Sequence, residues 1–143
     1  MTSYSSALRL GLLLGLLVGI GAAPSSAQEQ VIEKTAKGLP GKEIQIGVYF
    51  NVLSDCSSGT LPAVRLVSAP ANGTVNIKRG KVTATNYKQC LALETPAFIA
   101  FYKSKPDFSG VDSVLLEVKY PAGRTEIQKI SLIIGALQPD QKI

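Results

Sequence analysis

Alternation of apolar and polar side chains is the feature that most constrains the fold of this chain. Over Glu43–Asn51, the residues Ile44, Ile46, Val48 and Phe50 alternate with polar or small residues, and this spacing places Tyr49 on the polar side. A period of two is typical of a strand with one face in a core and the other toward water. No segment after residue 27 shows a sustained period of 3.6, so we expect an all-β chain.

Seven or eight short strands are predicted, separated by residues that favour turns, such as Arg79-Gly80. They cover Gln30–Lys34 as an edge strand, Glu43–Asn51, Ala63–Ser68, Thr74–Lys78, Lys81–Thr85, Ala97–Lys103, Ser113–Tyr120 and Thr125–Ile134. Hairpin-length connections, with no helices to cross between parallel strands, indicate an antiparallel immunoglobulin-like β-sandwich.

The N-terminal segment has the layout of a secretory signal peptide. One cation, Arg9, precedes an apolar run from Leu10 to Ala23, and small residues precede Ala27. We predict cleavage after Ala27, which leaves a domain of residues 28–143 in the periplasm or outside the cell, without stable membrane insertion. An uncleaved anchor is the alternative, but about 14 apolar residues are fewer than the roughly 20 that span a bilayer.

The two cysteines, Cys56 and Cys90, are predicted to form a disulfide. An oxidising compartment favours this bond, and no third thiol competes for it. The alternative is a metal-binding or redox-active thiol pair, which the absence of a Cys-x-x-Cys motif and of histidine disfavours.

Charge is mildly basic and spread along the chain. The formal net charge of +5 includes Arg9, so the predicted domain carries about +4, which indicates a solvated surface rather than a nucleic-acid-binding protein. Lys78, Arg79 and Lys81 group at a predicted hairpin tip. They could steer an acidic partner, although such charges more often protect a sheet edge from aggregation.

Two stretches resemble bacterial cadherin-like and immunoglobulin-like repeat domains. Pro70-Ala71-Asn72-Gly73-Thr74-Val75 resembles the turn and strand entry of these repeats, and the segment from Tyr102 to Val114 is similar to their signature. The matching positions are Pro70, Gly73, Tyr102, Pro106, Phe108, Gly110 and Asp112. Ser104 and Val114 depart from the pattern. The resemblance implies a sandwich and an interaction role, although such modules usually occur in tandem and this chain holds one copy.

The signature residues also have a purely physical interpretation. We expect Phe108 to insert its ring between the sheets, and Asp112 to cap backbone N–H groups of its own loop. A calcium site built from Asp55, Asp107 and Asp112 is the alternative, but three carboxylates fall short of the six or more oxygens that calcium takes. We therefore expect neither a metal nor another cofactor.

Catalysis is not expected. The chain has no histidine, and Ser104 lies between two lysines that a strand would turn to the opposite face. Glu94 and Glu117 have no partner that the sequence assigns for a carboxylate pair.

The resulting prediction is an exported, non-catalytic binding module whose partner is an unknown protein or glycan in the periplasm or extracellular space. The alternative is a structural, envelope-associated protein with no ligand of its own. A calcium-dependent domain or an enzyme is a weaker alternative.

Overall fold

The structure is a computed structural model that describes residues 15–16, 18–23 and 29–135. Seven strands make up the domain: β1 (Glu29–Gly38), β2 (Glu43–Tyr49), β3 (Ala63–Ser68), β4 (Gly73–Tyr87), β5 (Cys90–Ser104), β6 (Gly110–Lys119) and β7 (Thr125–Ile134). No helix able to cross a membrane occurs among the described residues. The predicted cleavage site after Ala27 lies outside them.

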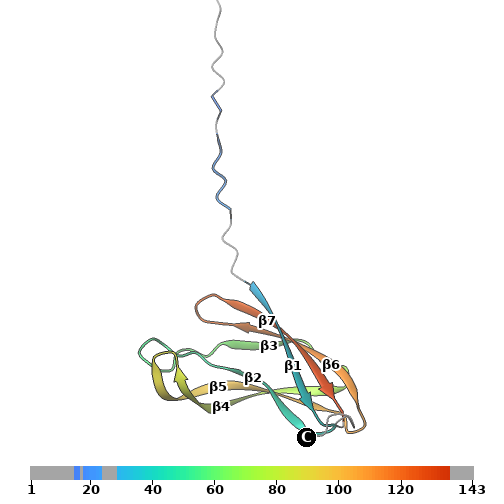
Figure 1. The fold of residues 1–143 in the computed structure, drawn as a ribbon. Helices are drawn as coiled ribbons and strands as arrows, with labels where there is room; N and C mark the ends of the chain where they lie inside the picture. Colours follow the sequence, from blue (N-terminus) through green and yellow to red (C-terminus); the bar gives the residue numbers. More distant parts are fainter. Residues whose placement is uncertain (1–14, 17, 24–28, 136–143) are drawn as a thin grey trace, which may run out of the picture.

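The strands form two sheets, with the orders β1-β7-β6-β3 and β2-β5-β4 (Figure 1). The prediction of an all-β, two-sheet domain is confirmed. The expectation that every pair is antiparallel is wrong for β1 and β7, which run parallel from Glu29 opposite Thr125 to Gly38 opposite Ile134. Parallel strands need a long connection, and here the other five strands supply it.

The core lies between the sheets and is built mainly by β5, β6 and β7. The alternation in β6 and β7 is confirmed, since every second residue is buried over 112–118 of β6 and over 126–134 of β7. The apolar members of this set, Val114, Leu116, Val118, Ile130, Leu132 and Ile134, are each at most 3% exposed. Burying one such side chain contributes about 1.5–3 kcal/mol, so this stripe dominates the packing energy.

Strand β2 departs from the predicted alternation. The pairing register with β5 shifts between Gln45 and Gly47, which is a β-bulge, and the buried face changes there. Tyr49, predicted to face water, is only 2% exposed, whereas Val48 and Phe50 are half-buried. The Tyr49 hydroxyl donates a hydrogen bond to Gln128 Oε1 at 2.5 Å, so its polar end is satisfied inside the domain.

Strand β4 is continuous where two strands and a turn were predicted. It pairs with β5 without a register shift, and Gly80 lies opposite Ala97 in mid-ladder. The hairpin turns instead at Lys88-Gln89, where Lys88 has φ 53°. The half-buried residues Val75 and Ile77 lie on one face of β4 and Val82 and Ala84 on the other, because different parts of the chain cover the two ends of the strand. Beyond the core, the β2–β3 connection covers the face of Thr95, whose hydroxyl lies 3.1 Å from Ser58 Oγ.

The disulfide between Cys56 and Cys90 is present, with the Cα atoms 5.8 Å apart. It joins the β2–β3 connection to the first residue of β5. Gln89 Nε2 strengthens the same junction by donating to the Ser54 carbonyl at 2.6 Å. The covalent bond therefore fixes this connection against the β4–β5 hairpin.

Replacing both cysteines, Cys56→Ala with Cys90→Ala, should lower the free energy of unfolding by roughly 3–4 kcal/mol, because the unfolded chain gains the entropy that the closed loop removes. Urea denaturation of the variant and the wild type measures the difference. As a control, the unfolded, unreduced wild type should titrate no free thiol. Equal stability of the two proteins would contradict the expected role of the bond.

Candidate functional site

The Asp112 carboxylate at the start of β6 is the centre of the signature segment. Its oxygens accept hydrogen bonds from the Tyr102 hydroxyl at 2.8 Å and from the backbone N–H groups of Ala71, Asn72 and Ser113 at 2.9–3.0 Å. The predicted cap is therefore present, but most of its donors differ from those expected. Asp112 caps chiefly the β3–β4 loop rather than its own loop, because the fold brings that distant turn beside it.

The surroundings of Asp112 and Tyr102 determine the ionisation of both side chains. Burial raises the pKa of Asp112, but hydrogen bonds from Tyr102 and the backbone outweigh that effect and hold the pKa below its usual value. Burial, followed by the hydrogen bond to Asp112, raises the pKa of Tyr102 above its usual value. At neutral pH the aspartate is charged and the tyrosine is neutral, so this pair acts as a structural clamp.

The remaining signature residues shape the space around this clamp. A Cβ at Gly73 would lie 2.5 Å from the Lys103 carbonyl oxygen and 2.7 Å from the Tyr102 ring, so the close approach requires glycine. Phe108 is half-buried and packs against the core at its edge, which is a shallower position than the predicted insertion between the sheets. Its ring also lies beside Gly110, whose φ of 142° favours glycine.

Two further members of the signature lie at the ends of loops. Pro70 is half-buried, just before the β3–β4 turn that Asp112 caps. Pro106 lies against Gly41 of the β1–β2 turn, since a Cβ at Gly41 would be 3.3 Å from the Pro106 Cα. Sequence reasoning missed the buried Ser104, whose hydroxyl accepts a hydrogen bond from the Gly41 N–H at 3.0 Å. The sequence marked this residue only as a departure from the family pattern and as a nucleophile that its lysine neighbours could not activate.

The three acids of the calcium alternative do not come together. Asp112 is occupied by the donors given above, and Asp55 accepts hydrogen bonds from the Ser57 N–H and hydroxyl. No group of three or more potential metal-ligating residues of the His, Cys, Asp or Glu types occurs within the described part of the chain.

A second polar cluster lies at the opposite end of the sandwich, and the prediction missed it. Gln128 accepts a hydrogen bond from the Tyr49 hydroxyl and donates one to the Glu126 carboxylate at 3.1 Å. Glu126 in turn forms an ion pair with Arg124 at 3.4 Å. Burial, followed by the charges of Tyr120 and Glu126, raises the pKa of Tyr49. The signal was available, because Glu126 and Gln128 share the parity of the buried apolar residues in β7.

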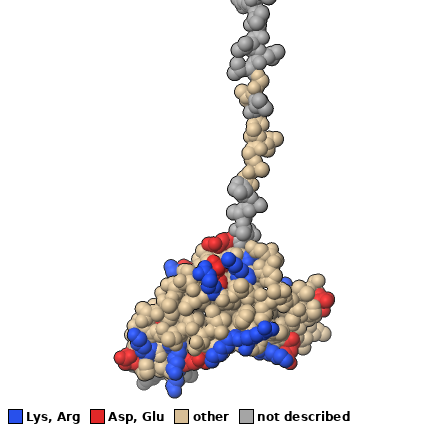
Figure 2. Space-filling view, turned by 180° about the vertical axis from the view of Figure 1, so that it is seen from behind, with Lys and Arg blue, Asp and Glu red and all other residues tan. Residues whose placement is uncertain are grey.

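The three predicted patch cations do not form one patch. Adjacent strand residues face opposite ways, so Lys78 lies on the outer face, 3.7 Å from Glu43, whereas Arg79 and Lys81 lie on the other face. Lys81 pairs with Glu94 at 3.6 Å. Figure 2 shows basic side chains spaced along the lower margin of the domain, with acidic ones between them.

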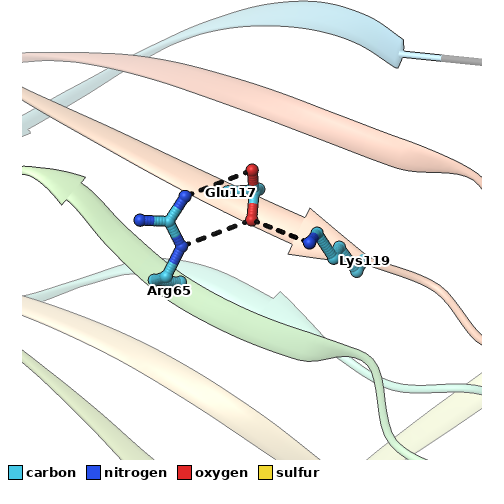
Figure 3. A network of polar contacts seen from close by, with 3 residues as sticks. All are labelled: Arg65, Glu117 and Lys119. Atoms are coloured by element: carbon cyan, nitrogen blue, oxygen red, sulfur yellow. Dashed lines mark hydrogen bonds and ion pairs between the residues drawn. The ribbon is translucent and has the colours of Figure 1, made fainter.

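The carboxylates considered for catalysis are paired with cations. Figure 3 shows Glu117 on the outer face of the four-stranded sheet, between Arg65 and Lys119. The distances are 3.3 Å from Arg65 and 3.7 Å from Lys119. The hydrogen bond from Arg65 lowers the pKa of Glu117, which keeps this half-buried carboxylate charged. Glu94 lies beside Lys81, so both Glu94 and Glu117 lie beside a cation rather than beside another carboxylate.

A groove of about 610 Å³ opens on the side where β3 and β4 are both edge strands. One wall comes from the end of the β2–β3 connection and the start of β3, and the other from β4 and β5. Its lining is largely apolar and consists of Gly59, Thr60, Leu61, Pro62, Ala63, Val64, Ile77, Arg79, Pro96 and Phe98. Arg79 is its only charged lining residue and has no carboxylate within 4.0 Å among the described residues.

Comparisons with known proteins leave this chain without an assigned family. No family model matches it, and no curated protein does. A solved structure titled "Solution Structure of Amebosin" aligns with a TM-score of 0.40 and 8% identity, over 76% of this chain and 98% of that chain. Similarity at that level carries no argument about fold or function.

Replacing Asp112 with alanine should lower the free energy of unfolding by about 3 kcal/mol, which is more than the loss of a single capping hydrogen bond. The reason is that several donors lose a charged acceptor together. The native pKa lies below the unfolded value, so the stabilisation is present above about pH 4 and is lost as the pH falls through the native pKa. Wild-type stability should therefore fall toward pH 2, and Asp112→Asn should show a smaller fall.

Urea denaturation from pH 2 to pH 7 measures this difference, with Asp107→Asn as the control on the neighbouring exposed aspartate. Calcium should leave the melting temperature of the wild type unchanged. A calcium-dependent rise that disappears in Asp112→Ala would instead identify a metal site.

Proposed function

We propose that this chain is an exported, non-catalytic binding module with an immunoglobulin-like sandwich, and that its ligand occupies the groove between β3 and β4. The single observation that carries the proposal is this groove, which has apolar walls and one cation that pairs with no carboxylate of the described residues. Protein ligand sites are typically concave and mostly apolar, with a few polar groups that orient the ligand.

The strand arrangement supports the immunoglobulin-like assignment. Such sandwiches hold about seven strands in two sheets, with the third, sixth and seventh strands together and the second, fifth and fourth strands together. The orders β1-β7-β6-β3 and β2-β5-β4 follow that division, with the first strand placed beside the last. The cadherin-like resemblance of the Tyr102–Asp112 segment is compatible with this arrangement and remains a prediction.

Two features support export and a binding role without catalysis. A disulfide is typical of proteins that fold in oxidising compartments, in agreement with the predicted signal peptide of residues 1–27. The most deeply buried tyrosines, Tyr49 and Tyr102, have raised pKa values and hydrogen-bonded hydroxyls, which suits structural roles.

Filling the groove tests this proposal. Arg79→Trp replaces the exposed groove-lining cation with a large side chain on the groove side of β4, and Lys37→Trp makes the same kind of change on exposed β1 as a matched control. A partner should co-purify from the exported fraction in stoichiometric amounts with the wild type and with Lys37→Trp. Arg79→Trp should reduce that yield at least tenfold.

The other outcomes contradict the proposal in different ways. Absence of any stoichiometric partner would favour the structural, envelope-associated alternative. Equal capture by Arg79→Trp and the wild type would show that the groove is not the binding site.

A further inference from the structure

The outer edge of β4 differs from the other sheet edges of the domain. β4 has 15 residues, pairs only with β5 among the described strands, and keeps one register along its whole length. β2 carries a bulge, and β3 has only six residues and a register shift between Leu66 and Ser68. Short strands and bulges protect edges from further pairing. β4 has neither form of protection.

The charges on β4 select what this edge can accept. β4 carries Lys78, Arg79 and Lys81 and no acidic residue, whereas the remaining edge strand, β1, carries charges of both signs. Antiparallel pairing of two β4 strands about this centre would bring like charges together, which is unfavourable. The same cations favour a strand that carries carboxylates. This edge is therefore protected against a second copy but open to an acidic segment.

The groove lies directly beside this edge. Ile77 and Arg79 of β4 line it, and Arg79 is opposite Phe98 of β5 in the ladder. A strand added along β4 would point alternate side chains toward the groove and the others toward the outer face. Apolar side chains on the groove side would pack beside Ile77, and a carboxylate there would reach Arg79.

Building on the proposed function, we infer that the outer edge of β4 binds an extended acidic segment of a partner protein by strand addition. Main-chain hydrogen bonds to β4 supply affinity, and side-chain contacts set the choice of partner. Valine-like side chains enter the groove. Two adjacent carboxylates face opposite ways, one beside Arg79 and the other beside Lys78.

A synthetic peptide tests this inference with the intact mature protein. The probe is an eight-residue peptide, blocked at both ends, with valine and threonine alternating around two central glutamates. Isothermal titration calorimetry at low salt should show binding to the wild type that weakens as salt is added. The Lys78→Glu, Arg79→Glu double variant should bind at least tenfold more weakly.

Matched controls separate strand addition from general charge attraction. The Lys37→Glu, Lys129→Glu variant makes the same change of charge on exposed residues of β1 and β7, and its affinity should equal that of the wild type. A peptide methylated on the backbone nitrogens of all its central residues, so that neither edge can donate, and one with lysines in place of the glutamates, should not bind. Equal binding of either peptide, or equal loss in both protein variants, would overturn the inference.

Two further results separate this inference from the proposed function. Binding of a sulfated oligosaccharide at Lys78 and Arg79, without binding of the glutamate peptide, would show that the site takes an anionic glycan and overturn the inference. Failure of the peptide to bind, while Arg79→Trp still abolishes partner capture, would leave the groove as the binding site and remove strand addition.

Discussion

The Asp112 carboxylate ties the two sheets together, and the arrangement of the domain depends on it. Asp112 belongs to β6 in one sheet, its partner Tyr102 belongs to β5 in the other, and its backbone donors at Ala71 and Asn72 lie where the chain passes from β3 to β4. One buried carboxylate therefore accepts the hydrogen bond of the tyrosine hydroxyl and holds the loop in which the chain passes from β3 to β4. Such a network requires all its members, since an unpaired buried donor or charge is costly.

This clamp and the disulfide act at different places and leave one side of the sandwich open. Asp112 fixes the crossing from β3 to β4, and the Cys56–Cys90 bond fixes the β2–β3 connection against the β4–β5 hairpin. Between these two fixed points, β3 and β4 remain as edges, with the groove between them. In the proposed binding role, these fixed flanking connections would present a preformed surface to the ligand, which reduces the ordering cost of binding.

Local alternation predicted the strands well, because packing on one face imposes a period of two. β3 and β7 have the predicted bounds, and the all-β, two-sheet architecture and the disulfide are confirmed. Three features depend on contacts between distant residues. The bulge that buries Tyr49 lies within a regular alternation of apolar and polar residues. The change of the covered face along β4 reflects the β2–β3 connection rather than a turn. Backbone donors to Asp112 come from another loop. The groove joins Ala63 to Arg79, which no local pattern connects.

The central claim is that binding occurs on the open side, along β4 and the groove. Amide hydrogen exchange, followed by NMR on the wild-type domain with and without its captured partner, tests this claim most directly, because it reports main-chain hydrogen bonding residue by residue. The account predicts added protection for residues 76–83 of β4 and for the groove-lining residues 59–64, with little change across the outer face of β1, β7 and β6. Added protection confined to that outer face, with none along β4, would contradict the account.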